Sequence, residues 1–260
     1  MSEARATHRE DGFLNNRLRL RSAPGGHRAG TDAVLLAAST PPQETGPILD
    51  AGAGEGAVGL MAGLFAPKAA LGLIEIDTAA CALARRNIAE NGVADRARVF
   101  EADLLDPAAR RAAGLCDEQA ALVLTNPPFH VAGRTRVSPD PDKARAHVAS
   151  APLAEWVRAC LALLAPVGEF VMIHRADALA ACLASVEGRL GGVAIVPVSP
   201  RAGAAAVRIL LRGRKGSRAP LSLLAPLVLH EADGSFTPLA QALHRGEAHW
   251  AEDGFRPDAS

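Results

Sequence analysis

The chain of 260 residues carries 28 lysines and arginines against 28 aspartates and glutamates, so its formal net charge is zero. Apolar residues make up 49% of it and charged residues 22%, which is ordinary for a globular protein and excludes a largely disordered chain. No apolar stretch is long enough for a membrane-spanning helix, and the charged segment 1–12 does not have the pattern of a signal peptide. We therefore expect one globular core, with a disordered segment over 1–12.

Two short elements are predicted next, within residues 13–45. In segment 17–21 arginine alternates with leucine, and this period of two is typical of a strand with one solvated face. Pro24-Gly25-Gly26 supplies a turn, so we expect a β-hairpin here. Gly30-Thr31-Asp32 then opens a short apolar helix over 33–38.

From residue 46 to residue 213, short apolar runs alternate with helical patterns. The apolar runs predict seven strands, at 47–51, 70–76, 98–101, 120–125, 169–174, 192–198 and 205–212. Helices are predicted at 56–65, 78–91, from about 107, 153–164 and 176–189. For the second of them, Thr78 is the expected N-cap and Gly92 the expected stop. This alternation is typical of an α/β fold with a mostly parallel seven-stranded sheet and helices on both faces. Ligands of such sheets bind beyond the carboxyl ends of the strands.

The chain after Gly213 gives weaker signals. A basic loop leads to an apolar stretch at 221–229, which Pro226 interrupts, and a small helix is expected after Pro238. We expect segment 214–260 to pack on the core or to be partly flexible.

Cysteine and histidine spacing bears on metals and location. The four cysteines form no C-x-x-C pair, and the histidines show no ligand spacing. The sequence therefore predicts reduced core thiols, no metal, no membrane partner and a cytoplasmic location. Nothing in it resembles a dimerisation helix or strand, so we expect a monomer.

A glycine-rich turn joins the first core strand to the first core helix. Asp50-Ala51-Gly52-Ala53-Gly54-Glu55-Gly56 lets the backbone turn sharply and approach a ligand closely. On its own it also fits the looser glycine pattern of dinucleotide enzymes, and Glu75 after the second strand fits either case. Asp50 before the glycines and Asp103 after the third strand favour methyltransferases of this architecture, in which the loop holds the methionine moiety of S-adenosylmethionine. Ile76 is expected to pack on the adenine.

Asn126-Pro127-Pro128-Phe129 follows the fourth strand and is the most specific signal. Two adjacent prolines cannot continue a strand, so they form a rigid turn at the edge of the sheet. This turn would present the Asn126 side-chain oxygen and the Pro127 carbonyl as acceptors for the two N–H groups of an aryl amine. Phe129 would stack on an extruded base, a contact worth about 1–3 kcal/mol.

These motifs resemble those of a known family. The loop and the N-P-P-F turn look like those of class I, Rossmann-like N-methyltransferases, and segment 30–36 followed by 49–54 resembles the tRNA1(Val) adenine-N6-methyltransferases. This resemblance implies methylation of an adenine in tRNA, with Asn126, Pro127, Pro128 and Phe129 as catalytic residues. Phe129 stands where the closest relatives often have tyrosine. The residues that the resemblance assigns to the cofactor are Thr31, Asp50, Gly52, Gly54, Gly56, Glu75, Ile76, Asp103, Leu104 and Asn126. Thr31 and Asp32 would lie near the methionine end or the substrate entrance.

Basic residues indicate RNA as the partner. Residues 188–230 contain seven arginines and lysines and no acidic residue, and a second basic run lies at 17–28. Loop 131–147 leaves the catalytic turn directly, and we expect it to be a mobile lid that contacts RNA phosphates. The expected RNA-binding residues are Arg28, Arg134, Arg136, Lys143 and Arg145.

Several alternatives stay open. His130 after the turn resembles the N-P-P-F-H of ribosomal guanine-N2 methyltransferases. Release-factor glutamine-N5 methyltransferases use a similar turn, but they carry a helical domain for which about 45 residues before the first core strand are too few. Outside these enzymes, the chain could be an RNA-binding module without catalysis. A nicotinamide-dependent oxidoreductase would leave the Asn-Pro-Pro-Phe turn without a purpose.

Overall fold

The computed structural model describes residues 9–23, 29–128, 152–251 and 254–257. Its strands are β1 Arg9–Phe13, β2 Leu18–Ser22, β3 Ile48–Ala51, β4 Leu71–Glu75, β5 Ala97–Glu101, β6 Ala120–Thr125, β7 Leu164–Arg175, β8 Leu190–Arg201, β9 Arg208–Lys215, β10 Ser222–Leu223, β11 Leu227–His230, β12 Ala248–Ala251 and β13 Gly254–Pro257. Its helices are α1 Thr31–Ala37, α2 Ala57–Phe65, α3 Thr78–Glu90, α4 Pro107–Ala112, α6 Leu153–Leu163, η1 Ala176–Ala178, α7 Leu179–Val186 and α8 Pro238–Arg245.

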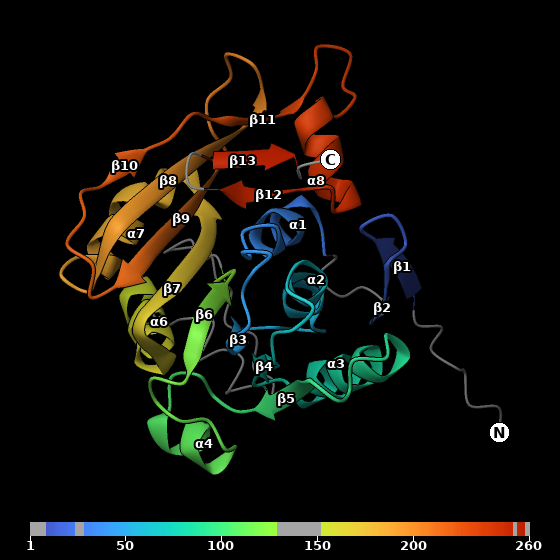
Figure 1. Ribbon diagram of the computed structural model, residues 1–260, viewed down its shortest axis with the longest axis vertical. Helices are drawn as coiled ribbons and strands as arrows, with labels where there is room; N and C mark the ends of the chain where they lie inside the picture. Colours follow the sequence, from blue (N-terminus) through green and yellow to red (C-terminus); the bar gives the residue numbers. More distant parts are fainter. Residues whose placement is uncertain (1–8, 24–28, 129–151, 252–253, 258–260) are drawn as a thin grey trace, which may run out of the picture.

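A central sheet organises the chain (Figure 1). Its strands follow the order β10-β8-β9-β7-β6-β3-β4-β5, with β11 also paired to β8, which makes nine strands. Strands β5, β4, β3, β6 and β7 are parallel, whereas β9 runs antiparallel to β7 and β8. The mostly parallel α/β sheet predicted from the sequence is thus confirmed. The predicted count of seven is wrong, because β10 and β11 on either side of Pro226 add short pairings along the edge of β8.

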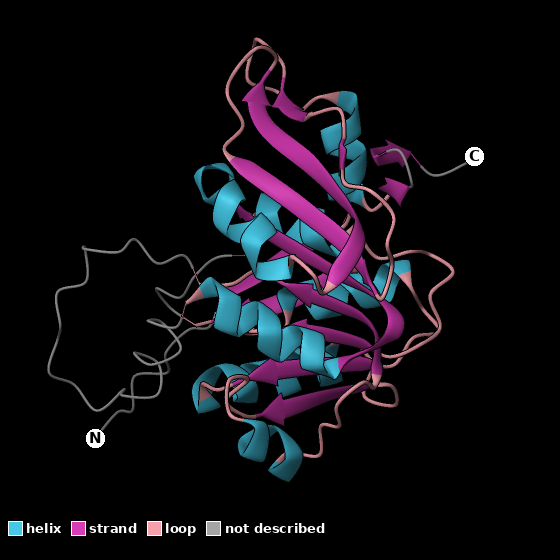
Figure 2. Cartoon of the chain, turned by 90° about the vertical axis from the view of Figure 1, so that its left-hand side faces the viewer, coloured by secondary structure: helices cyan, strands magenta, loops and turns pink. Residues whose placement is uncertain are grey.

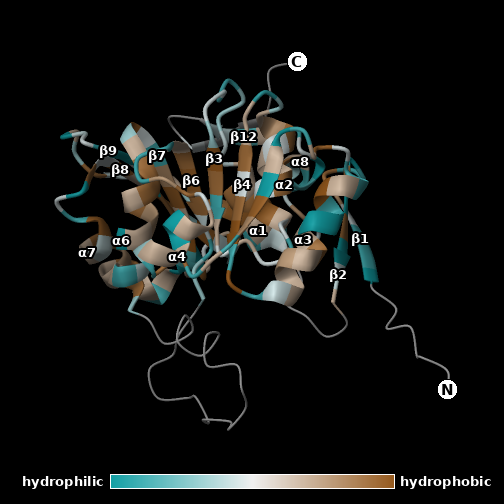
Figure 3. Cartoon of the chain, turned by 90° about the horizontal axis from the view of Figure 1, so that it is seen from below, coloured by the Kyte–Doolittle hydropathy of each residue, from teal (hydrophilic) through white to brown (hydrophobic). Residues whose placement is uncertain are grey.

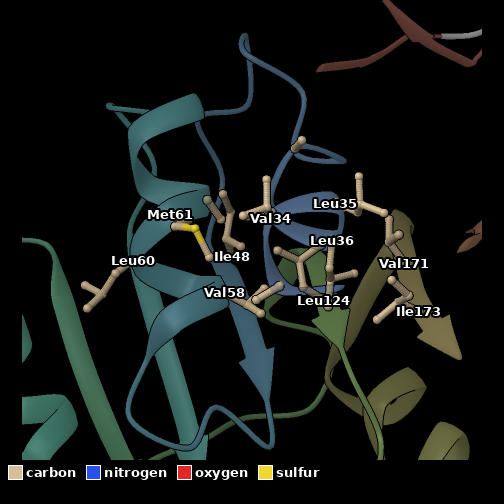
Figure 4. Close-up of a cluster of buried hydrophobic side chains, with 14 of the residues drawn as sticks. Val34, Leu35, Leu36, Ile48, Val58, Leu60, Met61, Leu124, Val171 and Ile173 are labelled. Atoms are coloured by element: carbon tan, nitrogen blue, oxygen red, sulfur yellow. The ribbon is translucent and has the colours of Figure 1, made fainter. Parts of the chain in front are cut away.

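Helices cover both faces of this sheet (Figure 2). Side chains of successive residues point to opposite faces of a strand, so Ile48 belongs to the core on one face and Leu49 to the core on the other. The first core holds α1, α2 and α3, and the second holds α6 and α7. Figure 3 shows that the strands of the central sheet consist mostly of hydrophobic residues, whereas the helices beside them contain both hydrophobic and hydrophilic residues. Figure 4 shows part of the first core, with Val34, Leu35, Leu36, Ile48, Val58, Leu60, Met61, Leu124, Val171 and Ile173.

Several helix ends differ from the prediction. The helix expected over 33–38 begins at Thr31 and ends at Ala37. Asp77, not Thr78, caps α3, because its carboxylate accepts a hydrogen bond from the Ala79 amide at 2.9 Å, whereas the Thr78 hydroxyl donates to Glu101. The helix expected over 176–189 is split into η1 and α7 and ends at Val186.

The amino-terminal hairpin exists, but its turn lies elsewhere. β1 pairs with β2 in antiparallel register, with Phe13 opposite Leu18, so the turn of this hairpin falls at residues 14–17, whereas the turn expected at 24–26 lies outside the described residues. Leu14, Asn15 and Asn16 adopt left-handed backbone conformations, which asparagine tolerates better than most residues. β1 begins at Arg9, inside the segment that was expected to be disordered.

The carboxyl-terminal segment packs against the same face of the sheet as α1. Leu243, Ala248 and Trp250 belong to the core that contains α1 and α2. The Trp250 amide also donates a hydrogen bond to the Ala38 carbonyl at 2.8 Å, which joins β12 to the end of α1.

Three of the four cysteines lie in the core. Cys81, Cys160 and Cys182 are buried, and burial raises the pKa of the Cys81 and Cys182 thiols to about 11. Cys116 is exposed in the loop before β6, so the prediction of a core thiol is wrong for it. Among the described residues, no helix has both the length and the apolar character needed to cross a membrane.

Close packing of α2 on β3 and β4 gives a first test. A Cβ atom on Gly59 would lie 2.2 Å from Leu73 Cδ2 and 3.1 Å from Asp50 Cβ, and both residues are buried. We expect Gly59→Ala to lower the free energy of unfolding by about 1–3 kcal/mol through overpacking, as measured by urea denaturation.

Ala89→Gly is the control, because Ala89 lies exposed on α3 and its replacement tests helix propensity alone, at about 1 kcal/mol. A Gly59→Ala protein at least as stable as the wild type would contradict the tight contact between α2 and β3.

Candidate functional site

The main cavity opens at the carboxyl ends of β3, β4 and β6. Its volume is about 670 Å³. In the sheet, Ala51 at the end of β3 lies opposite Ile74 of β4 and Thr125 of β6, so the residues after these strands meet at one edge. Among the predicted site residues, the cavity is lined by Asp50, Gly52, Gly54, Glu75, Ile76, Leu104, Asn126, Pro127 and Pro128, together with Asp32.

The glycine loop is shaped by its neighbours. Gly52 has a φ of +77°, and a Cβ atom there would lie 2.9 Å from the Trp156 ring. Gly54 has a φ of +55°, and a Cβ atom on it would meet nothing within 4 Å. Gly52 is therefore required for packing against the protein, whereas Gly54 borders open space that a ligand can enter.

Asp50 is a buried carboxylate within this cavity. Only 2% of it is exposed, and its Oδ2 accepts a hydrogen bond of 2.8 Å from the Gly59 amide near the start of α2. Burial raises the pKa of Asp50 to about 7, and Glu75 adds to the rise, while the Gly59 hydrogen bond opposes it. A cationic partner in the cavity would favour its charged form.

Glu75 is held by three backbone amides. Its Oε1 accepts from Ile76 and Asp77, and its Oε2 accepts from Gly54, each at 2.8 Å. A carboxylate has about four acceptor positions, so one position on Oε2 is left for a ligand. The contact with Gly54 also fixes the glycine loop to the end of β4.

Three residues assigned to the cofactor by resemblance do not line the cavity. Asp103 accepts a hydrogen bond from the Leu105 amide, while Ala102 and Leu104 on either side of it do line the cavity. Gly56 is the N-cap of α2 and packs on Leu73. The Thr31 hydroxyl lies 3.4 Å from Nε2 of His244 in α8.

Asn126 provides an unsatisfied acceptor. Its Oδ1 is buried and has no hydrogen-bond partner among the described residues. Buried polar atoms are rarely left in this state, because the loss of a partner costs about 1–3 kcal/mol. Phe129 and the expected RNA-binding residues Arg28, Arg134, Arg136, Lys143 and Arg145 lie outside the described residues.

Trp156 of α6 is a cavity residue that the sequence analysis missed. Its indole Nε1 donates to the Thr125 hydroxyl at 2.8 Å, and this hydroxyl donates to the Ala51 carbonyl at 2.9 Å. The chain of bonds links α6, β6 and β3 beneath Gly52. The only signal in the sequence was that Trp156 is one of two tryptophans.

The amino-terminal hairpin also contributes a wall that was missed. Leu20, Ser22 and Ala23 line the cavity, and so do Glu55 and Asp77. The Ala23 amide donates to the Glu55 carboxylate at 2.8 Å. No local pattern in the sequence indicated that a strand before the core would reach its cavity.

Four of the seven basic residues in 188–230 pair with acidic side chains of other segments. Arg208 pairs with Asp32 at 2.8 Å, Arg212 and Arg214 both pair with Glu169, and Lys215 pairs with Glu118 at 3.0 Å. The acidic partners come from distant segments, so the local sequence could not show them. In the described part of the chain, no ion pair is found for Arg189, Arg201 and Arg218.

Comparison with known proteins points to methyltransferases. A family model for the methyltransferase small domain matches residues 27–176. Two relatives named tRNA1(Val) (adenine(37)-N6)-methyltransferase are similar to the chain. The one from Aeromonas salmonicida is 30% identical over 88% of this chain and 93% of its own, and the one from Porphyromonas gingivalis is 31% identical over 81% and 84%.

Solved structures agree on the fold. A predicted O-methyltransferase from Agrobacterium tumefaciens has a TM-score of 0.72 at 32% identity, over 84% of this chain and 98% of its own. A tRNA (m1A58) methyltransferase from Aquifex aeolicus has a TM-score of 0.52 at 13% identity, over 78% and 76%, and shows the shared fold alone.

Asp50 gives a test of stability against pH. With a pKa of about 7 in the folded chain and 3.8 as its ordinary value, the buried carboxyl lowers stability progressively as the pH rises from about 4 to 7. Without ligand, Asp50→Asn should raise the free energy of unfolding at pH 8 by at most about 4 kcal/mol, since one pKa unit corresponds to about 1.4 kcal/mol. At pH 4 the difference should nearly vanish.

Denaturant unfolding at both pH values measures this difference. The wild type serves as the reference at each pH. An equal gain at pH 4 and pH 8 would show that the ionisation of Asp50 is not its cause.

Proposed function

The chain belongs to the methyltransferase small domain family and is a methyltransferase that uses S-adenosylmethionine, and from this premise we propose that it methylates N6 of an adenine in tRNA. The observation that carries the proposal is the buried Asn126 Oδ1, which has no hydrogen-bond partner in the described part of the chain and lies in the same cavity as the glycine loop. An amino group of the substrate would supply the missing donor.

The cavity fits the cofactor. The free acceptor position of the Glu75 carboxylate suits a ribose hydroxyl of the cofactor, and the open space beside Gly54 suits its methionine moiety. The apolar residues Ile76 and Leu104 suit the adenine. Asp50 would face the ammonium group of the methionine moiety, and Glu75 would accept a ribose hydroxyl. The roles of Thr31, Gly56 and Asp103 are proposed on resemblance alone.

Methyl transfer to an amine needs orientation more than a strong base. S-adenosylmethionine supplies a methyl group activated by a sulfonium. Asn126 Oδ1 and the Pro127 carbonyl would each accept one N–H of the adenine amine, which turns the nitrogen lone pair toward the methyl group. As the new N–C bond forms, the bond between the methyl group and the sulfonium would break, S-adenosylhomocysteine would leave, and the nitrogen would give up one proton to solvent.

The same two oxygens, Asn126 Oδ1 and the Pro127 carbonyl, favour nitrogen over oxygen as the atom that receives the methyl group. One relative of known structure is described as a predicted O-methyltransferase, but a hydroxyl has one hydrogen to donate and would leave one acceptor unpaired. An adenine amine satisfies both, and so would guanine N2 or a glutamine amide. The relatives named as adenine-N6 methyltransferases favour adenine.

RNA recognition completes the proposal. Phe129 would stack on the extruded base, and Arg28, Arg134, Arg136, Lys143 and Arg145 would contact phosphates, as the sequence predicts. We also propose that the enzyme acts as a monomer in the cytoplasm.

Asn126→Ala tests the proposal. We expect at least about a 100-fold loss of kcat, because an oriented polar contact at a reacting centre is commonly worth that much. Labelled methyl transfer to bulk tRNA, followed by nucleoside analysis, measures it. The wild type should yield N6-methyladenosine.

The transfer is measured at saturating S-adenosylmethionine and the dissociation constant is measured alongside, because the resemblance also assigns Asn126 to the cofactor and Asn126 lines the cavity. Label in N2-methylguanosine would move the acceptor to guanine, and label in protein would favour the glutamine reaction. Full activity of Asn126→Ala would remove this residue from the mechanism.

A further inference from the structure

Asn87 of α3 and Asn91, the C-cap residue of this helix, take the place of a neighbouring strand for β2. The Arg21 amide donates to Asn87 Oδ1 at 2.8 Å, and Asn87 Nδ2 donates to the Arg21 carbonyl at 3.1 Å. Asn91 repeats the arrangement with Arg19, at 3.0 Å and 2.7 Å. The two pairs of hydrogen bonds keep the same spacing on both sides, because four residues of a helix rise about 6 Å and two residues of a strand about 6.6 Å.

Asn87 makes one contact that Asn91 lacks. Its Nδ2 also donates to the main-chain carbonyl of Glu55 at 2.9 Å. Asn87 is fully buried, whereas Asn91 is partly exposed at the end of α3. Both donors of the Asn87 amide are therefore used, one on the hairpin and one on the glycine loop.

Glu55 belongs to the loop that borders the cofactor cavity. Its carboxylate accepts the Ala23 amide, so the main chain and the side chain of Glu55 are both tied to the hairpin, through Asn87 and directly. On its other side the loop is tied to β4 by the hydrogen bond from Gly54 to Glu75. The Gly52 and Ala53 amides also donate to the Ile74 carbonyl, at 3.0 Å and 2.9 Å, so the loop is attached to β4 at its start and to the hairpin at Glu55.

The hairpin forms part of the same cavity. Leu20, Ser22 and Ala23 line it together with Gly52, Gly54 and Glu55. A displacement of β2 would move the hairpin wall of the cavity and, through Asn87, the end of the glycine loop at Glu55. Asn91 holds β2 as firmly but has no connection to the loop.

We propose that Asn87 is a positioning residue that couples the cofactor loop to the amino-terminal hairpin, so that cofactor binding and the hairpin wall depend on each other. This inference rests on the proposed cofactor site and extends it to a residue outside the cavity. Asn87 does not line the cavity and would act through its hydrogen bonds to Glu55 and Arg21.

The matched pair Asn87→Ala and Asn91→Ala tests the proposal. Both variants remove two hydrogen bonds to β2, but only Asn87→Ala releases Glu55. We expect the dissociation constant for S-adenosylmethionine, measured by calorimetry on the full chain, to rise about tenfold in Asn87→Ala and less than twofold in Asn91→Ala. Equal effects in both variants, or no effect in Asn87→Ala, would overturn the coupling.

A measurement on the wild type covers the case that Asn87→Ala does not fold. Binding of S-adenosylmethionine should slow hydrogen exchange at the Arg21 and Ala23 amides of the hairpin as well as in the loop. Protection confined to the loop would overturn the proposal. A wild-type chain that does not bind S-adenosylmethionine would overturn the cofactor assignment itself, which is a different result from equal affinities in the variants.

Discussion

The hydrogen bond from the Gly59 amide to the buried Asp50 carboxylate fixes the geometry on which the site depends. It holds α2 against the end of β3, and Gly59 packs so closely on β4 that a Cβ atom there would lie 2.2 Å from Leu73 Cδ2. The loop between strand and helix is then confined to a few residues and must turn through left-handed conformations at Gly52 and Gly54. Packing of one helix on one strand thus determines where the loop faces the cavity.

The same site is locally unfavourable for folding. Asp50 is a buried carboxylate with a raised pKa, and Asn126 Oδ1 is a buried acceptor without a partner among the described residues. Each of these lowers stability. A cation beside Asp50 and an N–H donor beside Asn126 would relieve the cost, and the proposed cofactor and substrate carry such groups. The apolar strands around them supply the compensating stability, since Ile48, Leu49 and Leu124 are almost completely buried.

Local sequence patterns were enough for the core strands and for the two motifs at their ends. Continuous apolar runs such as 120–125 predicted a buried strand, and Asn126 follows it directly, so the position of this residue came with the strand. The register of the hairpin could not be predicted, because β1 is mostly polar and its turn uses Asn15 and Asn16 rather than Pro24 and glycine. Contacts between distant segments, such as Trp156 beneath Gly52 or Arg208 with Asp32, have no local signal at all.

The cavity is therefore lined by two parts of the chain, of which only one lies within the segment that matches the family model. The family match covers residues 27–176, which include the glycine loop, Glu75 and Asn126, whereas the hairpin lies before it. The hairpin nevertheless lines the cavity, and the residues that hold it, Asn87 and Asn91, lie inside the matched segment. Asn87 and Asn91, inside the matched segment, thus determine where the hairpin before it can dock. Arg21 of the hairpin also pairs with Glu90 of α3. The position of this cavity wall therefore depends on α3 as much as on the sequence of the hairpin itself.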